Sequence, residues 1–403
     1  MALLSVEQAL ARVLDNVDPT PAEMVALAHA CGRVLAADLA AQRTQPPADV
    51  SAMDGYAVRA TDVASAPARL RLIGEVAAGR PFAGCVGPGE AARIFTGGVM
   101  PEGTDTVVIQ ERTERDGDVV TVAAPARPRA NVRVAALDFA RGSVLLKNGR
   151  RLTGRDIALA AAMNHATIPV HRRPRIAVLA TGDELVAPGT TPGPGQIVYS
   201  NGFALAAMAR EEGAEIIDLG IVPDLVDATA AAAQRAGTSG ADVLVTTGGA
   251  SVGEYDLVQK ALASQGMALS FWKIALRPGR PMMHGRLGRM RVLGLPGNPV
   301  SSYVCAFLFL LPLIRRLTGR NDLHAATESA LLGRALPAND ERADYLRATL
   351  AKNPGGELTA FPAEIQDSSM LLPLANADCF VVREPYAPAA PVGSRCAIVK
   401  LGL

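Results

Sequence analysis

Three glycine-rich segments carry the side chains and backbone groups with the clearest chemical potential. They are Thr181-Gly-Asp-Glu184, the stretch Thr246-Thr-Gly-Gly-Ala-Ser-Val-Gly-Glu-Tyr-Asp256, and Leu295-Pro-Gly-Asn-Pro-Val-Ser301. In the second segment, Gly248, Gly249 and Gly253 allow backbone N–H groups to approach an anion, and a following helix would add its positive N-terminal dipole. The segments predict a phosphate-binding site, although each one taken alone is also explained as a tight corner.

Acidic and basic residues near these segments extend the prediction. Glu184, Asp224 and Asp256 each lie just past a predicted strand, where carboxylates could hold Mg²⁺ or activate a nucleophile. Asp224 is equally well explained as the N-cap of the helix that follows it. Arg277-Pro-Gly-Arg280 places two guanidinium groups on one turn, as an oxyanion or phosphate would require, and its alternative explanation is a solvated turn.

Two further polar loops lie in the first third of the chain. One is Ser51-Ala-Met-Asp-Gly-Tyr-Ala-Val58, which carries Asp54, and the other is Arg93-Ile-Phe-Thr-Gly-Gly-Val-Met-Pro101, which carries Thr96. Turn formation explains the Asp-Gly pair by itself. It does not explain why both loops combine polar groups with hydrophobic neighbours.

Composition and missing motifs exclude several classes of function. Neither Gly-x-Gly-x-x-Gly nor the P-loop motif is present, which disfavours a dinucleotide oxidoreductase and a P-loop NTPase. The 40 basic and 39 acidic residues give a formal net charge of +1, so no overall field favours nucleic acid or an anionic membrane. The five cysteines are scattered without metal-ligand spacing, and the first residues lack a basic signal-peptide region. We expect a cytoplasmic enzyme.

The elements that must position these groups fall into several domains, because 403 residues exceed one ordinary core. Ser5 and Gln8 form a capping box and predict a first helix. Thr20, Pro21 and the later Gly32 predict a second helix, over about residues 21–32. Short apolar runs between residues 42 and 128 predict a small β-rich domain.

From residue 175 the pattern alternates between short apolar strands and capped helices. The strands are expected at 176–180, 215–219, 242–246 and 291–295, and the helices at 202–212, 225–236, 255–264 and 300–317. Such alternation predicts βαβ units with a parallel sheet, which binds ligands beyond the carboxyl ends of its strands. The three glycine-rich segments fall at those ends. Residues 304–314 are apolar but contain Pro312 and are too short to span a bilayer, which takes about 20 residues.

Six motifs together resemble the MoeA family of molybdopterin molybdenumtransferases, which is similar to the E domain of gephyrin. The motifs are Ser51-Ala-Met-Asp-Gly-Tyr-Ala, Arg93-Ile-Phe-Thr-Gly, Thr181-Gly-Asp-Glu-Leu, Thr247-Gly-Gly-Ala-Ser-Val-Gly, Arg277-Pro-Gly-Arg-Pro and Leu295-Pro-Gly-Asn-Pro-Val-Ser. They occur in the family's order over essentially the whole chain. The family tail is matched by Gln366-Asp-Ser-Ser-Met and Leu374-Ala-Asn376.

The resemblance implies a multidomain α/β fold with a doubly wound, Rossmann-like central domain. It divides the chain into a helical linker domain (1–42 with 133–173), a β-rich domain (43–132), a molybdopterin-binding α/β domain (174–320) and a β-barrel-like domain (321–403). It also implies a homodimer whose active site lies between the central domain of one subunit and the β-rich domain of the other.

The implied activity is molybdenum insertion into adenylylated molybdopterin. The implied reaction consumes molybdate, uses Mg²⁺ and releases AMP. The implied partners are an upstream adenylyltransferase and downstream cofactor-transfer proteins. Two alternatives remain open at this stage. One is an adenylyltransferase that uses the same central fold, and the other is a non-catalytic scaffold or paralogue that retains the fold.

Carried over position by position, the resemblance assigns catalytic roles to Asp54, Thr96, Glu184, Asp224 and Asp256, with the last three also binding metal. The residues expected to contact molybdopterin, phosphate or molybdate are Thr181, Gly182, Asp183, Gly248, Gly249, Ser251, Gly253, Arg277, Arg280, Pro296, Gly297, Asn298, Pro299, Ser301, Arg133, Asp138 and Ser369. Two departures stand out. The family's Arg-x-x-Gly-Glu-Asp motif reads Arg133-Val-Ala-Ala-Leu-Asp138, and arginines replace common lysines at 277 and 280.

Overall fold

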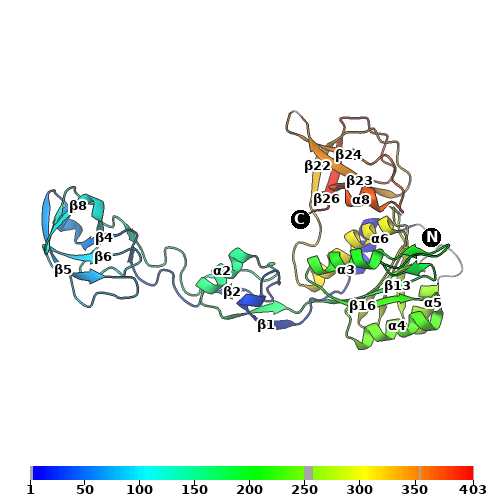
Figure 1. Ribbon diagram of the computed structural model, residues 1–403, viewed down its shortest axis with the longest axis horizontal. Helices are drawn as coiled ribbons and strands as arrows, with labels where there is room; N and C mark the ends of the chain where they lie inside the picture. Colours follow the sequence, from blue (N-terminus) through cyan, green and yellow to red (C-terminus); the bar gives the residue numbers. More distant parts are fainter. Residues whose placement is uncertain (1–2, 249–256, 354, 403) are drawn as a thin grey trace.

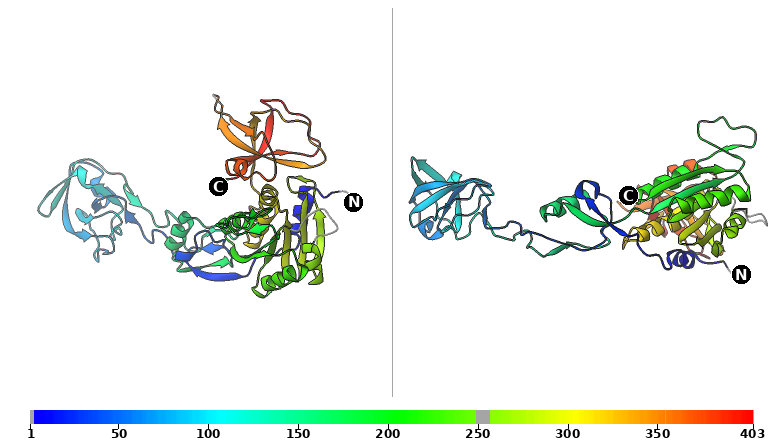
Figure 2. Two further views of the ribbon diagram at one scale, coloured as in Figure 1. Left: turned by 45° about the vertical axis from the view of Figure 1, so that its right-hand side comes forward. Right: turned by 90° about the horizontal axis from the view of Figure 1, so that it is seen from below.

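The computed structural model describes residues 3–248, 257–353 and 355–402. The molecule is elongated, with the β-rich domain at one end, a slender linker in the middle and the central and C-terminal domains at the other end (Figure 1). The other two views show the same separation (Figure 2). The predicted multidomain α/β architecture is confirmed.

The first helix, α1 (Val6–Leu14), begins at the expected capping box. The Gln8 N–H donates to Ser5 Oγ at 3.1 Å, and the Ser5 N–H donates to Gln8 Oε1 at 3.2 Å. Ala9 and Val13 are fully buried in the core of the central domain. The helix therefore packs on the central domain, although the sequence grouped it with the linker.

The prediction of a second helix, over about residues 21–32, is wrong. Residues Ala22–Ala26 form strand β1, which pairs antiparallel with β12 (Thr167–His171), and only Leu27–His29 make a short 3₁₀ turn. The start signals at Thr20 and Pro21 are local, whereas β12 lies far along the chain. A long-range partner for the backbone outweighs a weak helix preference.

The rest of the linker is small and held by its own core. It contains β2 (Leu39–Ala40), which pairs with β11 (Val144–Leu146), and α2 (Gly154–Ala162). The predicted helix start at α2 is present, since Asp156 Oδ2 accepts hydrogen bonds from the Thr153 N–H and Oγ1, both at 2.8 Å. Two extended segments, paired at β3 (Val50–Ser51) and β10 (Val132–Arg133), lead to the β-rich domain.

The β-rich domain contains a sheet with strand order β7-β4-β6-β5-β9-β8. The strands are β4 (Gly55–Val58), β5 (Ala68–Val76), β6 (Glu90–Ile94), β7 (Thr106–Ile109), β8 (Thr113–Asp116) and β9 (Val119–Val122). β4 and β6 are antiparallel neighbours. The residue before β4, Asp54, therefore lies beside the segment that follows β6, which contains Thr96.

The central sheet has strand order β16-β13-β17-β21-β20-β18. Its strands are β13 (Arg175–Thr181), β16 (Glu215–Val222), β17 (Val243–Thr247), β18 (Ala268–Lys273), β20 (Pro281–Leu287) and β21 (Met290–Leu295). The first four in this order are parallel, β20 is antiparallel to them, and β18, which pairs antiparallel with β20, again runs in their direction. The four strands that the sequence predicted are parallel, as expected. The sheet is nevertheless mixed, because a hairpin adds β20, which the sequence did not predict, antiparallel to β21.

Helices cover both faces of this sheet. On one face, α3 (Asn201–Glu211) packs with α1 and with the helical segment Pro299–Leu317, and on the other face lie α4 (Val226–Thr238) and α5 (Leu257–Ser264). Figure 1 shows α3 and α6 above the strands and α4 and α5 below them. The inner strands β13, β17 and β21 are consequently buried on both sides, as their continuous apolar sequences require.

The segment Pro299–Leu317 is a single helical rod, so Pro312 does not interrupt it. It consists of α6 (Pro299–Cys305), a π-helical turn (Ala306–Leu310) and α7 (Leu311–Leu317). The wider π turn comes directly before the proline, where an ordinary α-helix would lose a hydrogen bond. Its length and hydropathy would suffice for a membrane crossing, but 72% of it is buried inside the protein, which is typical of a core helix.

The C-terminal domain is a small closed barrel. Strands β23 (Ala343–Lys352), β24 (Leu358–Pro362), β22 (Thr327–Leu332), β26 (Arg395–Lys400) and β25 (Cys379–Arg383) follow one another around it, and β25 pairs back with β23. A short strand from the central domain, β19 (Leu276–Arg277), joins the barrel beside β23. The Arg277 turn thus connects the two domains.

Candidate active site

The described parts of the three glycine-rich segments lie together at one edge of the central sheet. They follow β13, β17 and β21, which are adjacent and parallel, so their carboxyl ends lie together. A Cβ on Gly297 would lie 3.6 Å from the Gly248 Cα, and a Cβ on Gly248 would lie 2.3 Å from the Thr181 carbonyl oxygen. Gly248 also has φ +88°, so both the backbone and the space require glycine.

Thr181 and its neighbours leave hydrogen-bonding capacity at this edge. Thr181 is buried, and its Oγ1 has no hydrogen-bond partner among the described residues. The same holds for Thr246 Oγ1 on the neighbouring strand. Buried hydroxyl groups without partners are uncommon, and they are candidates for hydrogen bonding to a ligand or an ordered water.

Carboxylates gather next to these loops. The Asp224 N–H donates to Asp183 Oδ1 at 3.2 Å, and a Cβ on Gly182 would lie 2.6 Å from Glu184 Oε2. Burial raises the pKa of Asp224, and the negative charges of Asp183 and Glu184 raise it further. The N-cap explanation for Asp224 is wrong, since Leu225 is the N-cap of α4.

Mg²⁺ fits this donor set, although the described residues contain no group of three or more possible ligands that could by themselves hold a metal ion. Magnesium commonly uses one or two carboxylates and takes its remaining ligands from water and substrate phosphates. Glu184 and Asp224 supply the right oxygen chemistry. The other predicted residues of the second segment, Gly249, Ser251, Gly253 and Asp256, lie outside the described residues.

The Pro296–Pro299 loop is fixed by residues that the sequence did not single out. The Asn201 Nδ2 donates to the Gly297 carbonyl oxygen at 2.7 Å, and the Asn298 Nδ2 donates to Ser368 Oγ at 2.8 Å. Ser368 thus touches the loop, whereas the predicted Ser369 donates to Asp367 Oδ1 at 2.6 Å. The Asp-Ser-Ser sequence was a signal for this contact but could not say which serine makes it.

Ser301 and Tyr199 complete the surroundings of the loop. Ser301 is buried in α6, which begins at Pro299. Tyr199 is buried as well, and burial raises its pKa to about 12, with the negative charge of Asp218 adding to the shift and a hydrogen bond with Thr247 opposing it. The phenol is therefore neutral at physiological pH. No sequence motif pointed to Tyr199.

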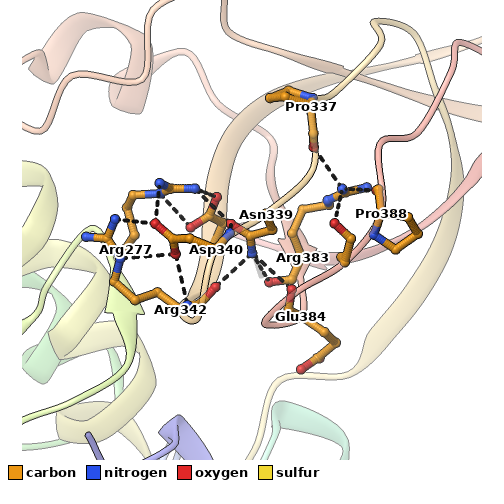
Figure 3. A network of polar contacts seen from close by, with 10 residues as sticks. Arg277, Pro337, Asn339, Asp340, Arg342, Arg383, Glu384 and Pro388 are labelled. Carbon is orange, nitrogen blue, oxygen red and sulfur yellow. Dashed lines mark hydrogen bonds and ion pairs between the residues drawn. The ribbon is translucent and has the colours of Figure 1, made fainter.

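The two arginines of the Arg277–Arg280 turn have different environments. The Arg277 Nε donates to Asp344 Oδ1 at 2.7 Å, Nη1 to Asp340 Oδ2 at 3.2 Å and Nη2 to Asn339 Oδ1 at 2.8 Å (Figure 3). Carboxylates of the C-terminal domain thus neutralise its charge. This pairing does not fit the prediction that Arg277 offers a free guanidinium to an oxyanion. The exposed Arg280 makes no ion pair with any described residue and keeps that capacity.

A second polar unit lies in the β-rich domain. Asp54 Oδ1 accepts hydrogen bonds from the Thr96 N–H at 2.7 Å and from Thr96 Oγ1 at 2.8 Å. These bonds hold the pKa of Asp54 below its usual value, with a smaller contribution from the Arg93 guanidinium. That guanidinium lies over the Tyr56 and Phe95 rings, 5.0 Å from each centroid. The polar and apolar residues of the two loops therefore form one surface.

Comparison with known proteins identifies the fold. The description MoeA N-terminal region (domain I and II) matches residues 4–164, Probable molybdopterin binding domain matches 177–316, and MoeA C-terminal region (domain IV) matches 329–401. The molybdopterin molybdenumtransferase of Haemophilus influenzae is 35% identical over 385 residues, 95% of each chain. The chain belongs to the MoeA family.

Other MoeA relatives agree with this assignment. The molybdopterin molybdenumtransferase of Nostoc sp. is 41% identical over 76% of this chain and 71% of its own length. The crystal structure of the molybdopterin biosynthesis MoeA protein from Pyrococcus horikosii aligns with a TM-score of 0.86 at 31% identity, covering all of both chains. The prediction of a transferase of the MoeA family is confirmed.

Within this MoeA chain the two polar units are far apart. The β-rich domain with Asp54 and Thr96 stands at the opposite end of the molecule from the central sheet (Figures 1 and 2). Arg133 and Asp138 are exposed on the connection between them. Ala136, where the family motif has glycine, still has the left-handed φ of +61° that glycine would favour.

Proposed function

We propose that this chain inserts molybdenum into adenylylated molybdopterin, taking molybdate as the metal source and releasing AMP. The observation that carries the proposal is the meeting of Thr181, Gly248 and Gly297 beside the carboxylates Glu184 and Asp224. Such an edge combines glycine loops that a phosphate can approach with oxygen ligands for a cation. The names of the MoeA relatives supply the substrate class.

The central domain would bind the pyrophosphate and the oxyanion. The backbone at Gly248 and the buried Thr181 hydroxyl provide donors for phosphate oxygens, and Arg280 provides a free guanidinium for molybdate. Glu184, Asp224 and Asp256 would hold Mg²⁺, which when bound would neutralise charge on the pyrophosphate. The raised pKa of Asp224 supports a cation site, because a cation relieves the repulsion among clustered carboxylates.

A second copy of the chain would complete the site. Asp54 and Thr96 form a preorganised unit that the linker holds far from the central sheet of its own chain (Figure 1). In a symmetric homodimer, the β-rich domain of each subunit can meet the central domain of the other. The dimer therefore explains why one chain carries two separate polar units.

The cellular setting follows from the proposed substrate. We place the protein in the cytoplasm, downstream of the adenylyltransferase that makes adenylylated molybdopterin and upstream of proteins that deliver the finished cofactor. The near-neutral net charge fits small-molecule chemistry rather than nucleic-acid or membrane binding.

The test is an assay of AMP release from adenylylated molybdopterin with Mg²⁺ and either molybdate or tungstate. We expect oxyanion-dependent AMP release by the wild-type protein and strong loss in Glu184→Gln. Glu215→Gln is the matched control, because Glu215 is exposed in a surface ion pair at the other end of the sheet. Absence of AMP release, or ATP-dependent adenylylation of molybdopterin in its place, would contradict the proposal.

A further inference from the structure

Two arginines lie directly opposite each other on neighbouring strands, at the edge of the central sheet away from the candidate active site. Arg286 on β20 is the register partner of Arg291 on β21. Like charges in such positions destabilise a sheet unless something compensates them. Arg291 is 5% exposed, and among the described residues neither arginine has a carboxylate within ion-pair distance.

Part of the compensation comes from the end of helix α1. The Arg291 Nη2 donates to the Asp15 and Asn16 carbonyl oxygens at 2.7 and 2.6 Å, and the Arg286 Nη2 donates to the Asp15 oxygen at 2.8 Å. Cations at the C-terminal end of a helix are favourable. Carbonyl groups are dipoles, however, and they leave both full charges in place.

A cavity of about 490 Å³ opens beside this pair. Its charged lining residues are Asp18, Arg172, Asp242, Arg286, Arg289 and Arg291. Arg172 is bonded to both oxygens of Asp242, at 2.9 and 3.1 Å, so these two charges cancel. The three remaining arginines face one carboxylate, Asp18, and the cavity carries a net charge of about +2.

The environment of Arg291 agrees with this excess of positive charge. Burial lowers its pKa, and the charge of Arg286 lowers it further, while Asp15 and Asp18 act in the opposite direction. Arg289 is exposed, lines the cavity and makes no ion pair with any described carboxylate. Guanidinium groups in this arrangement suit planar, bidentate contacts to phosphate oxygens.

We propose that this cavity binds a ligand carrying a dianionic phosphate group. The site is separate from the candidate active site, because Arg291 stands near the beginning of β21 and the Pro296 loop follows its other end. The charge of the ligand matches the excess in the cavity. The phosphate belongs either to inorganic phosphate or to a nucleotide, and the experiment distinguishes these sources.

The experiment is calorimetric titration of the full chain with inorganic phosphate and, separately, with AMP, at low ionic strength. An Arg280→Ala background removes the free guanidinium of the candidate active site. Into it we introduce Arg286→Ala with Arg289→Ala, leaving Arg291 because it holds the end of α1. The matched control is Arg69→Ala with Arg115→Ala, which removes the same charge from the distant β-rich domain.

We expect the Arg280→Ala protein to bind one phosphate-bearing ligand per chain in this cavity, and the Arg286/Arg289 change to weaken binding at least about tenfold. The control change should leave affinity within about twofold. Tighter binding of AMP than of phosphate would identify a nucleotide, and the reverse would identify free phosphate.

Two results would overturn the proposal. One is absence of binding by the Arg280→Ala protein at tens of millimolar of either ligand, and the other is unchanged affinity in the Arg286/Arg289 variant. Thermal unfolding of each variant checks that it is folded. If the double variant is unfolded, Arg289→Ala alone serves as the test, since Arg289 is exposed, and it should weaken binding about threefold. These outcomes do not depend on AMP release by the wild-type protein.

Discussion

The two polar units of this MoeA chain are built in opposite ways. The loops at the central sheet join residues that are far apart in sequence, such as Thr181, Gly248 and Gly297, because three parallel strands end at the same edge. Asp54 and Thr96 instead meet across two antiparallel neighbours, β4 and β6, in an exposed position.

The difference decides how much of the structure sets the geometry of each unit. The central loops depend on a core that is buried on both faces, so their geometry is set by the whole domain. The Asp54 unit depends on one pair of neighbouring strands, and the linker holds its domain far from the central sheet (Figure 1). Under the proposed function these two units are the halves of one site, which leads to the first and largest prediction.

Subunit complementation should show whether the halves meet across a dimer. Asp54→Asn and Glu184→Gln should each lower AMP release by about a hundredfold or more when present in both subunits. Coexpression of the two variants should restore about a quarter of wild-type activity, because half of the dimers are mixed and each has one intact site of two.

Coexpression of Glu184→Gln with Asp224→Asn is the control. Both changes lie in the central domain, so every site of a mixed dimer keeps one damaged residue and activity should stay low. No recovery with Asp54→Asn would show that a single chain assembles the site. Recovery in the control would show that Glu184 and Asp224 of one chain do not serve the same site.

Matched glycine substitutions should sharpen the contrast in packing. Gly248→Ala should cost about 3 kcal/mol, since φ is +88° and the new Cβ would lie 2.3 Å from the Thr181 oxygen. Gly97→Ala, next to Thr96, has φ +82° but no atom closer than 4.0 Å, so only about 1 kcal/mol is expected. Denaturant unfolding measures both, and equal costs would contradict the contrast.

Acid should destabilise the central domain before the β-rich domain. His284 is 2% exposed, and burial, followed by the charges of Arg291 and Arg286, lowers its pKa to about 4. Its contribution is present above the unfolded pKa of about 6.5 and is lost as the pH falls toward 4. The loss amounts to about 2 kcal/mol at pH 5. Residues 43–132 contain no histidine.

His284→Phe should remove this acid sensitivity, because the new ring is never charged. Unfolding followed by hydrogen exchange at pH 7 and pH 5 would separate the domains. His29→Gln, at an exposed position, is the control and should behave as the wild type. A wild-type central domain that is equally stable at both pH values would contradict the assignment.

The smallest expected effect lies in the connection between the two units. Ala136→Gly should stabilise the linker by about 0.5 kcal/mol, because glycine relieves the left-handed φ of +61° at some cost in chain entropy. Ala135→Gly, which lacks a positive φ, should be slightly destabilising. Denaturant unfolding of the two variants compares them, and a stabilising Ala135→Gly with a destabilising Ala136→Gly would reverse the prediction.

Much of the fold could be predicted from local patterns. The capping boxes at Ser5 and Thr153 mark the starts of α1 and α2, and the alternating segments after residue 175 became the strands and helices of the central domain. The positions of the glycine loops at the strand ends were also predictable, since apolar periodicity fixes where a strand stops. The motifs alone pointed to the MoeA family.

The sequence by itself determined the family, most of the elements and the residue types available for chemistry, because those depend on neighbours in the chain. Only the tertiary structure decided which of these residues contact each other. It paired β1 with a strand far along the chain, hydrogen-bonded Arg277 to Asp344 of the barrel and placed Ser368 against Asn298. It also placed the β-rich domain, which contains Asp54, at the opposite end of the molecule from the central domain, which contains Glu184 (Figure 1). Each of these depends on which surfaces meet after folding, and long-range contacts leave no periodic signal in the residues that make them.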